Sequence, residues 1–270
     1  MITRPEFPDL LFFKNLSAES TILHFSTTRN GGVSTGKFSS LNLGNYSDDS
    51  PLNIFENRTR VARKFHMTAD QMITPHQTHG NKVVLIDNQF LELSNSSKID
   101  ALYGYDASIT GEKGIFLCVT TADCVPILLY DRKNGAVGAI HAGWRSTSGK
   151  IVENTIDAMM HNFGTSPEDI LAAIGPAIGI DNYEVGDEVV EELIKNGFNL
   201  NEPLLSRNPK TGKAHIDLKE INRQTLIGLG VSEEKIEKTS FCTYSNKQLF
   251  FSARRQSIRS GRMLSGIMIR

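Results

Sequence analysis

The stretch IFLCVTTADCVPILLYDRKNGAVGAIHAGWRST, residues 115–147, decides the fold class of this protein. It holds three short apolar runs, at 115–121, 125–131 and 136–141, separated by a few polar or glycine residues. The runs are apolar throughout and do not alternate between apolar and polar residues. Because continuous apolar runs of this length are typical of strands covered on both faces, the stretch predicts buried strands.

The same pattern continues on both sides of this stretch. Further apolar runs, at 21–26, 82–86, 170–175 and 264–269, predict four more strands. Segments with helical periodicity lie between the predicted strands, so that strands and helices are interleaved along the whole chain. This order is typical of an α/β protein.

The predicted helices are marked by start signals and apolar stripes. Ser50 and Pro51 are typical of an N-cap followed by proline at the first helical position, and they predict a helix to about Phe65. Asp217 and Glu220 have the spacing of a capping box. Three stripes predict further helices: Ile151, Val152, Thr155, Met159 and Phe163; Val189, Val190, Leu193 and Ile194; and Ile221, Thr225 and Leu229.

Composition excludes several classes of protein. The chain has 270 residues, of which 39% are hydrophobic and 22% charged, so it is not disordered. Its 29 basic and 30 acidic residues nearly cancel, which argues against a large nucleic-acid footprint. The odd count of 3 cysteines cannot form a disulfide framework. We therefore expect a globular protein that does not bind nucleic acid.

The domain organisation and location are also expectations at this point. The N-terminal segment has an apolar run of four residues, 10–13, which is too short for a signal peptide or a membrane span. We expect a soluble cytoplasmic protein that forms one domain over residues 1–270, with 198–213 as a surface excursion. Whether it is a monomer or a weak dimer stays open.

Three segments place polar, reactive residues beside predicted strands and next to glycine or proline. They are TPHQTHG at 74–80, TTADCVP at 120–126 and HAGWRST at 141–147. Together they hold Cys124, His141 and the two histidines His76 and His79. Cysteine with two histidines is a sound zinc ligand set, and three protein ligands with an open position are typical of catalytic zinc. The alternative is a small buried cysteine and ordinary loop histidines.

Arginines near glycine-rich turns indicate a site for a small anion. Arg145 lies just ahead of residues 147–149, where a helix is expected to begin, so a guanidinium and helix N–H groups would meet. Arg29 precedes the pair Gly31 and Gly32, which suits an anion-binding nest or a hairpin turn. The segment 250–262 adds further cations, among them Arg255. Solvent-exposed arginines explain each of these positions as well.

The motifs HQTHG, TTADCVPILLYD and IHAGWRST, in this order, resemble the multicopper polyphenol oxidase (laccase-domain) family. The flanking blocks that resemble it are STTRNGGVSTGKFSSLNLG, AIGPAIGIDNYEVGDEV and CTYSNKQLFFSARRQSIRSGRMLSG. Members of this family, the YfiH and YlmD group, have been reinterpreted as purine nucleoside phosphorylases. The resemblance implies a single-domain, four-layer α-β-β-α sandwich, similar to the catalytic domain of cytotoxic necrotizing factor.

The resemblance also implies a metal held by His79, Cys124 and His141. We expect zinc, although copper could enter such a site in vitro because it binds more tightly. His76 is expected outside the ligand set, because the family block centres on Gln77, Thr78 and His79. The implied reaction is a glycosyl transfer in which phosphate cleaves adenosine, inosine or methylthioadenosine to the free base and ribose 1-phosphate.

Phosphorolysis requires a held phosphate, stabilised charge and a proton for the leaving purine. We assign catalysis to Cys124 and His141 through the metal, with Asp123 as the first candidate for proton transfer and Glu184 as the second. An activated water at the metal would suit adenosine deamination as a side activity. The residues expected to contact substrate or phosphate are Arg29, Asn42, Gln77, Arg145 and Arg255.

Two rival activities stay open. A copper-dependent polyphenol oxidase would use the same cysteine and histidines, but a multicopper cluster needs more imidazoles than 7 histidines can readily supply. A cysteine hydrolase would use Cys124 as nucleophile and His141 as base. Whether the sulfur carries a metal distinguishes the hydrolase from the zinc enzyme.

Overall fold

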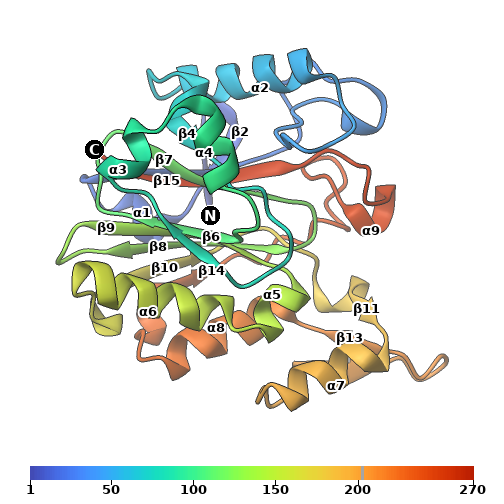
Figure 1. The fold of residues 1–270 in the computed structure, drawn as a ribbon. Helices are drawn as coiled ribbons and strands as arrows, with labels where there is room; N and C mark the ends of the chain where they lie inside the picture. Colours follow the sequence, from blue (N-terminus) through green and yellow to red (C-terminus); the bar gives the residue numbers. More distant parts are fainter. Residues whose placement is uncertain (202–203) are drawn as a thin grey trace.

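Two six-stranded sheets form the centre of the computed structural model, which describes residues 1–201 and 204–270 (Figure 1). In spatial order the first sheet contains β1 (Ile2–Arg4), β2 (Phe7–Phe12), β3 (Ile22–Thr27), β15 (Met263–Ile269), β7 (Phe116–Thr121) and β4 (Met72–Ile73). The second contains β14 (Ile236–Lys238), β10 (Ile170–Ile174), β8 (Val125–Asp131), β9 (Ala136–Ala142), β6 (Ala107–Thr110) and β5 (Val83–Leu85).

The two sheets pack face to face around one apolar layer. Leu117 and Ile267 of the first sheet belong to the same buried cluster as Leu128 and Val137 of the second. Their neighbours on the same strands face the opposite way, toward helices. This explains why β8, β9, β10 and β15 are buried at every position, as their continuous apolar runs predicted.

Helices cover the outer faces of both sheets (Figure 1). Against the first sheet, Val61 of α2 packs near Phe25 and Phe116. Against the second sheet, Ile156 of α6 and Leu226 of α8 share a cluster with the outward side chains of β8 and β9. The expected four-layer α-β-β-α sandwich is therefore confirmed.

The helices are α1 (Lys14–Ser17), α2 (Pro51–Arg63), α3 (Asn88–Glu92), α4 (Asn95–Ala101), α5 (Trp144–Ser148), α6 (Ile151–Phe163), α7 (Asp187–Lys195), α8 (Leu218–Gly228) and α9 (Ala253–Gln256).

The helix signals were confirmed, but several details differ. Ser50 is the N-cap of α2, but its side chain makes no capping hydrogen bond, and the helix ends at Arg63 rather than near Phe65. The α7 stripe buries its valines and Leu193, whereas Ile194 is 55% exposed because it falls on the solvent side of the helix. Apolar spacing alone did not identify the edge of that stripe.

The segment 198–213 includes residues 202–203, which lie outside the described residues. Its described part contains β12 (Leu205–Arg207) and an exposed turn in which Gly212 N donates to Asn208 O at 2.8 Å. The turn leads into β13 (Ala214–Ile216), which pairs with β12 and with β11 (Glu184–Val185) in a small third sheet. The expected surface excursion is therefore partly a β-hairpin.

The chain passes repeatedly between the two large sheets. The link from β4 to β5 and the link from β7 to β8 both cross from the first sheet to the second, and β15 returns to the first. No single cut would separate the sheets, so one domain over residues 1–270 stays our prediction, to be tested by a single cooperative unfolding transition. Within the described residues, no helix has the length and apolar character needed to cross a membrane.

Acid is expected to destabilise the fold through His24 on β3. Burial lowers the pKa of His24 to about 3, with a further contribution from Arg4, and Phe13 N donates to its Nε2 at 2.9 Å. Between pH 6.5 and 3 the unfolded chain binds a proton that the folded chain does not, so the free energy of unfolding falls as pH falls, by about 1.4 kcal/mol per pH unit.

The variant His24→Gln tests this assignment, because its side-chain oxygen can accept the same hydrogen bond without titrating. Urea unfolding at pH 7 and pH 5 is expected to show a smaller acid loss of stability in the variant than in the wild type. Equal losses in both proteins would assign the acid sensitivity to other groups.

Candidate active site

A pocket of about 750 Å³ lies where the chain crosses from the first sheet to the second. The crossing from β4 to β5 contributes His79, and the crossing from β7 to β8 contributes Cys124. His141 lies next to the end of β9 and points into the same pocket, followed at once by α5. The three segments that stood out in the sequence therefore converge on one cavity.

His79, Cys124 and His141 form a group that could hold a metal ion. Their ligand atoms all lie within 4.8 Å of one another, and His79 Nε2 is 3.8 Å from Cys124 Sγ. Bond lengths of about 2.0–2.3 Å at tetrahedral angles place zinc ligands about 3.3–3.6 Å apart, so the three ligand atoms would have to move closer together when zinc binds. Three ligands leave one coordination position for water or substrate.

Local backbone geometry permits this convergence. A Cβ atom at Gly143 would lie 3.0 Å from His79 Cδ2 and 3.2 Å from Cys124 Sγ, so a larger residue would crowd two of the three ligands. His79 and Asp123 both have positive φ angles, of 61° and 89°. Left-handed backbone at non-glycine residues is uncommon and is typical of functional sites held by their surroundings.

Buried Asp106, which the sequence analysis did not single out, contacts two of these segments. Its Oδ1 lies 2.7 Å from His141 Nδ1, and its carboxylate also accepts hydrogen bonds from the backbone N–H groups of residues 78–80. Burial alone would raise the pKa of Asp106, but His141 and these N–H groups lower it. No motif marked this residue, because its partners are 26 to 35 positions away in the chain.

The cysteine and histidine also alter each other's protonation. Burial would raise the pKa of the Cys124 thiol, but His141 and His79 lower it to about 6. Burial would likewise lower the pKa of His141, whereas Cys124 and Asp106 raise it to about 9. A thiolate beside imidazoles is the form of cysteine that binds a metal or acts as a nucleophile.

Two residues expected to contact substrate are occupied by protein contacts. Gln77 lines the pocket, but its side chain pairs with Thr120, donating to Thr120 O at 2.8 Å and accepting from Thr120 N at 2.8 Å. Asn42 is fully buried and does not line the pocket; its amide contacts Ser47 and Asp49, and its oxygen accepts from Arg262 N. Gln77 therefore forms part of the pocket wall, whereas Asn42 lies behind it and holds the backbone of Arg262.

The arginines separate into two groups. Arg29 and Arg255 do not line the pocket, and their guanidinium groups donate to carbonyl oxygens, including Ser39 O for Arg29 and Phe250 O for Arg255. Arg145 does line it. The helix expected near residues 147–149 begins earlier, at Trp144, so Arg145 lies inside the short helix α5 rather than ahead of it.

Other pocket arginines come from the C-terminal segment. Arg254, Arg259 and Arg262 line the pocket, although sequence reasoning had named only Arg255 in this region. The guanidinium group of Arg262 is largely occupied by hydrogen bonds within the protein, because it donates to Ser260 O at 2.6 Å and to Ile258 O at 2.6 Å. The Arg254 side chain donates a hydrogen bond from Nη1 to Glu184 O at 2.8 Å.

The two candidates for proton transfer differ in position. Asp123 lines the pocket and is 8% exposed, and its carboxylate accepts hydrogen bonds from Thr243, Ser252 and the Arg254 N–H at 2.6, 3.0 and 2.7 Å. Glu184 lies on β11 outside the pocket lining and forms an ion pair with Lys213 at 2.9 Å.

Aromatic residues at the pocket were also missed by sequence reasoning. The Tyr46 ring stacks on His76, with centroids 3.7 Å apart and planes 10° apart, and Tyr103 meets the other side of His76 edge-on at 4.7 Å. His76 therefore lines the pocket but lies outside the candidate metal group, as expected. Trp144 and Tyr183 complete an aromatic lining.

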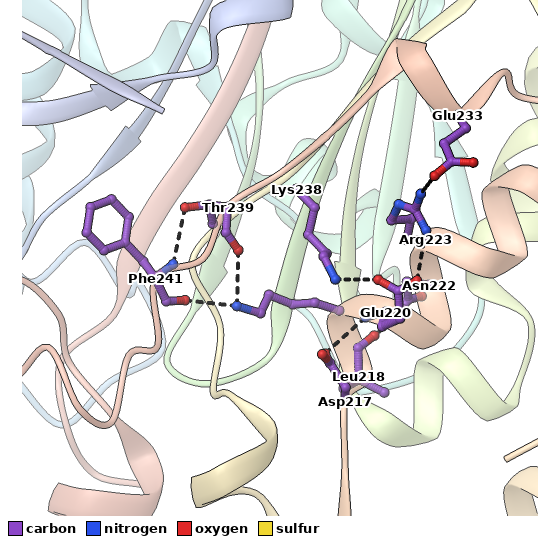
Figure 2. Close-up of polar contacts among 10 residues, drawn as sticks. Asp217, Leu218, Glu220, Asn222, Arg223, Glu233, Lys238, Thr239 and Phe241 are labelled. Atoms are coloured by element: carbon purple, nitrogen blue, oxygen red, sulfur yellow. Dashed lines mark hydrogen bonds and ion pairs between the residues drawn. The ribbon is translucent and has the colours of Figure 1, made fainter. Parts of the chain in front are cut away.

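A buried lysine anchors the loop that supports Asp123. Lys219 of α8 is 5% exposed and donates to Thr239 O at 3.2 Å and to Phe241 O at 3.0 Å. Figure 2 shows the carbonyl groups of Thr239 and Phe241 turned toward this contact, beside the ion pair between Lys238 and Glu220. The loop then continues to Thr243, whose hydroxyl donates a hydrogen bond to Asp123.

Asp217 caps α8 as its spacing predicted, but the Glu220 side chain pairs with Lys238 and Arg223 rather than with the cap.

Comparison with known proteins identifies the family of this chain. The family model described as multi-copper polyphenol oxidoreductase laccase matches residues 23–270. The chain belongs to this family. The match includes the three segments that carry the candidate ligands and the whole of the four-layer fold apart from β1, β2, α1 and the first residue of β3.

Relatives within the family carry enzyme names. A protein of Bacteroides thetaiotaomicron named purine nucleoside phosphorylase is 46% identical over 261 residues, which cover 96% of each chain. A protein named adenosine deaminase RL5, from an unknown prokaryotic organism, is 42% identical over 90% of this chain and 92% of its own. The crystal structure of the hypothetical protein YfiH of Bacillus licheniformis superposes with a TM-score of 0.89, at 32% identity over 97% of both chains. These likenesses confirm the family and the fold expected from the sequence.

Proposed function

We propose that this protein is a zinc-dependent purine nucleoside phosphorylase. It would cleave adenosine, inosine and methylthioadenosine with inorganic phosphate to the free base and ribose 1-phosphate. The observation that carries the proposal is the meeting of a Cys/His/His ligand group with arginines and aromatic rings in one pocket of nucleoside size. The names of two relatives, purine nucleoside phosphorylase and adenosine deaminase, support the substrate class.

The donor set favours zinc over copper. One thiolate and two imidazoles in a compact group suit zinc, because His141 and His79 lower the pKa of the Cys124 thiol and Asp106 orients the His141 ring. When bound, zinc would supply Lewis acidity, which would also suit adenosine deamination as a side activity. Copper entry in vitro stays compatible with the same ligands.

The arginines of the pocket would hold phosphate. The Arg145 side chain makes no hydrogen bond or ion pair within the described part of the chain, and the Arg254 guanidinium donates one hydrogen bond to a carbonyl oxygen, so both side chains retain N–H donors. A guanidinium can donate to two phosphate oxygens at once, which both binds and orients the anion. We assign phosphate binding to Arg145 and Arg254, while the same role for Arg29 and Arg255 would require their carbonyl contacts to break.

The remaining pocket residues would bind the nucleoside. The Tyr46–His76 stack and Trp144 offer flat surfaces for a purine, which favours base stacking. For proton transfer to the leaving base, position favours Asp123 over Glu184, because only Asp123 lines the pocket. The three hydrogen bonds that Asp123 accepts would hold its carboxylate in a fixed orientation.

A cysteine hydrolase is the second candidate, and one observation favours it. Asp106, His141 and Cys124 form an acid–histidine–cysteine series, with 2.7 Å between Asp106 Oδ1 and His141 Nδ1. The same arrangement activates nucleophilic cysteines in other enzymes. A polyphenol oxidase is less supported, because among residues 1–201 and 204–270 the pocket lining adds only one histidine, His76, to His79 and His141.

The deciding experiment measures product with and without phosphate. Protein of known zinc content is incubated with inosine, and hypoxanthine and ribose 1-phosphate are quantified. Phosphorolysis predicts equal amounts of both products and no base release when phosphate is omitted. Base release that proceeds equally well without phosphate would reject the proposal and favour hydrolysis. Oxygen consumption with a phenol substrate in the same preparation would favour the oxidase.

A further inference from the structure

One buried carboxylate contacts two of the three candidate metal ligands. Asp106 is fully buried at the start of β6, and each of its oxygens accepts two hydrogen bonds. Oδ1 is 2.7 Å from His141 Nδ1 and 3.0 Å from His79 N. Oδ2 is 3.1 Å from Thr78 N and 2.7 Å from Gly80 N. The carboxylate therefore connects β9 with the loop that carries His79.

The contact with His141 determines which nitrogen of that ring can bind a metal. A carboxylate can only accept hydrogen bonds, so its partner Nδ1 must carry the proton. In the neutral ring Nε2 of His141 then carries the lone pair, so Nε2 is the atom that a metal in the pocket would bind. A second contact, from His141 N to Asp106 O at 2.7 Å, fixes the backbone of the same residue.

The contacts with residues 78–80 determine the direction of His79. Three successive N–H groups converge on one carboxylate, an arrangement that forms an anion-binding nest. The loop needs a left-handed conformation at His79, with φ of 61°, which a non-glycine residue adopts at some energetic cost. Hydrogen bonds to the buried charge offset that cost and direct the His79 ring toward Cys124.

We propose that Asp106 is a positioning residue that fixes both histidine ligands, setting the tautomer of His141 and the left-handed turn of His79. The inference builds on the proposed metal site but does not require phosphorolysis. Its consequence is that metal affinity depends on a residue that does not touch the metal. Such outer partners of metal ligands typically change affinity by about 10- to 100-fold when they are replaced.

The variant Asp106→Asn provides a sharp test, because an amide cannot replace this carboxylate in either orientation. If the amide oxygen faces His141 and His79, the NH₂ group opposes the N–H groups of Thr78 and Gly80. If the amide is rotated, the NH₂ group opposes His79 N and stabilises His141 with its proton on Nε2, where it blocks the metal. We therefore expect zinc affinity, measured by competition with a chelator, to fall about 10- to 100-fold.

Asp131→Asn is the matched control. Asp131 is also fully buried and accepts hydrogen bonds from the N–H groups of Lys133 at 2.9 Å and Asn134 at 3.0 Å, but it lies outside the pocket lining. A general effect of removing a buried charge would weaken zinc binding equally in both variants. We expect Asp131→Asn to lower the thermal midpoint and to change zinc affinity less than twofold.

Two further measurements keep the proposal falsifiable whether or not Asp106→Asn folds. Histidine ¹⁵N spectra of the zinc-loaded wild type should show the His141 proton on Nδ1; a proton on Nε2 would overturn the proposal. Asp106→Glu keeps the charge, so it should retain this tautomer and bind zinc more tightly than Asp106→Asn. A folded Asp106→Asn with wild-type zinc affinity would also overturn it. Zinc binding without phosphorolysis would reject the proposed function alone.

Discussion

Cys124→Ala is expected to abolish stoichiometric zinc binding and to reduce phosphorolysis by about 10³-fold or more. The thiolate is the only anionic member of the ligand group, and its loss leaves two neutral imidazoles. Lewis acidity contributes several kcal/mol to reactions that depend on it, and each 1.36 kcal/mol corresponds to about a tenfold change in rate. The fold should persist, because the ligands connect loops that already have their own hydrogen bonds.

Zinc is measured by metal analysis of the purified variant, and folding by its thermal transition. Cys242→Ala is the matched control: Cys242 is also partly buried and accepts a hydrogen bond from Gly179 N at 3.1 Å, but it does not line the pocket. It should keep both zinc and activity. Stoichiometric zinc in Cys124→Ala would refute the ligand assignment.

Alkylation of the wild type distinguishes the zinc-dependent phosphorylase from a cysteine hydrolase. A thiolate that is bound to zinc is shielded from alkylation, so iodoacetamide should label Cys124 only after zinc is removed. If the zinc-free wild type is fully active and alkylation abolishes that activity, Cys124 acts as a nucleophile and the hydrolase is the better assignment.

Neutralising Arg145 or Arg254 is expected to weaken the use of phosphate strongly. Arg145→Gln and Arg254→Gln should each raise the KM for phosphate or lower turnover by about 10- to 150-fold, since a charged hydrogen bond contributes about 1.5–3 kcal/mol. Initial rates at varied phosphate and saturating inosine measure the effect. Zinc content should be unchanged, because neither arginine belongs to the ligand group.

Two control variants test whether the effect on phosphate is specific to the pocket arginines. Arg132→Gln replaces an exposed arginine that pairs with Glu19 outside the pocket, and it should leave the phosphate KM unchanged. Arg29→Gln removes a guanidinium bound to Ser39 O, so its main effect should be on stability. If Arg29→Gln raises the phosphate KM while Arg145→Gln and Arg254→Gln do not, phosphate binds at Arg29 and the assignment to Arg145 and Arg254 is wrong.

Local patterns in the sequence were sufficient for the α/β class and for the set of candidate metal ligands, whereas the four layers and the choice of His79 over His76 came from the family resemblance. The apolar runs at 125–131 and 136–141 became β8 and β9 because a strand buried on both faces must be apolar at every position. Asp217 became the cap of α8 because capping depends on residues three positions apart. Cys124, His79 and His141 were recognisable because each stands in a short segment with its own glycine or proline and in a family motif.

Only the tertiary structure decided which other residues reach the pocket. Arg254 and Arg255 are adjacent in the chain, yet only Arg254 lines the pocket, because the single turn of α9 points them in different directions. Asp106 has no motif, and its role depends on hydrogen bonds to residues on two other segments. Side-chain direction and long-range partners are set when the two sheets pack together. For that reason the local sequence identified the candidate ligands, while only the fold brought Asp106 and Arg254 to them.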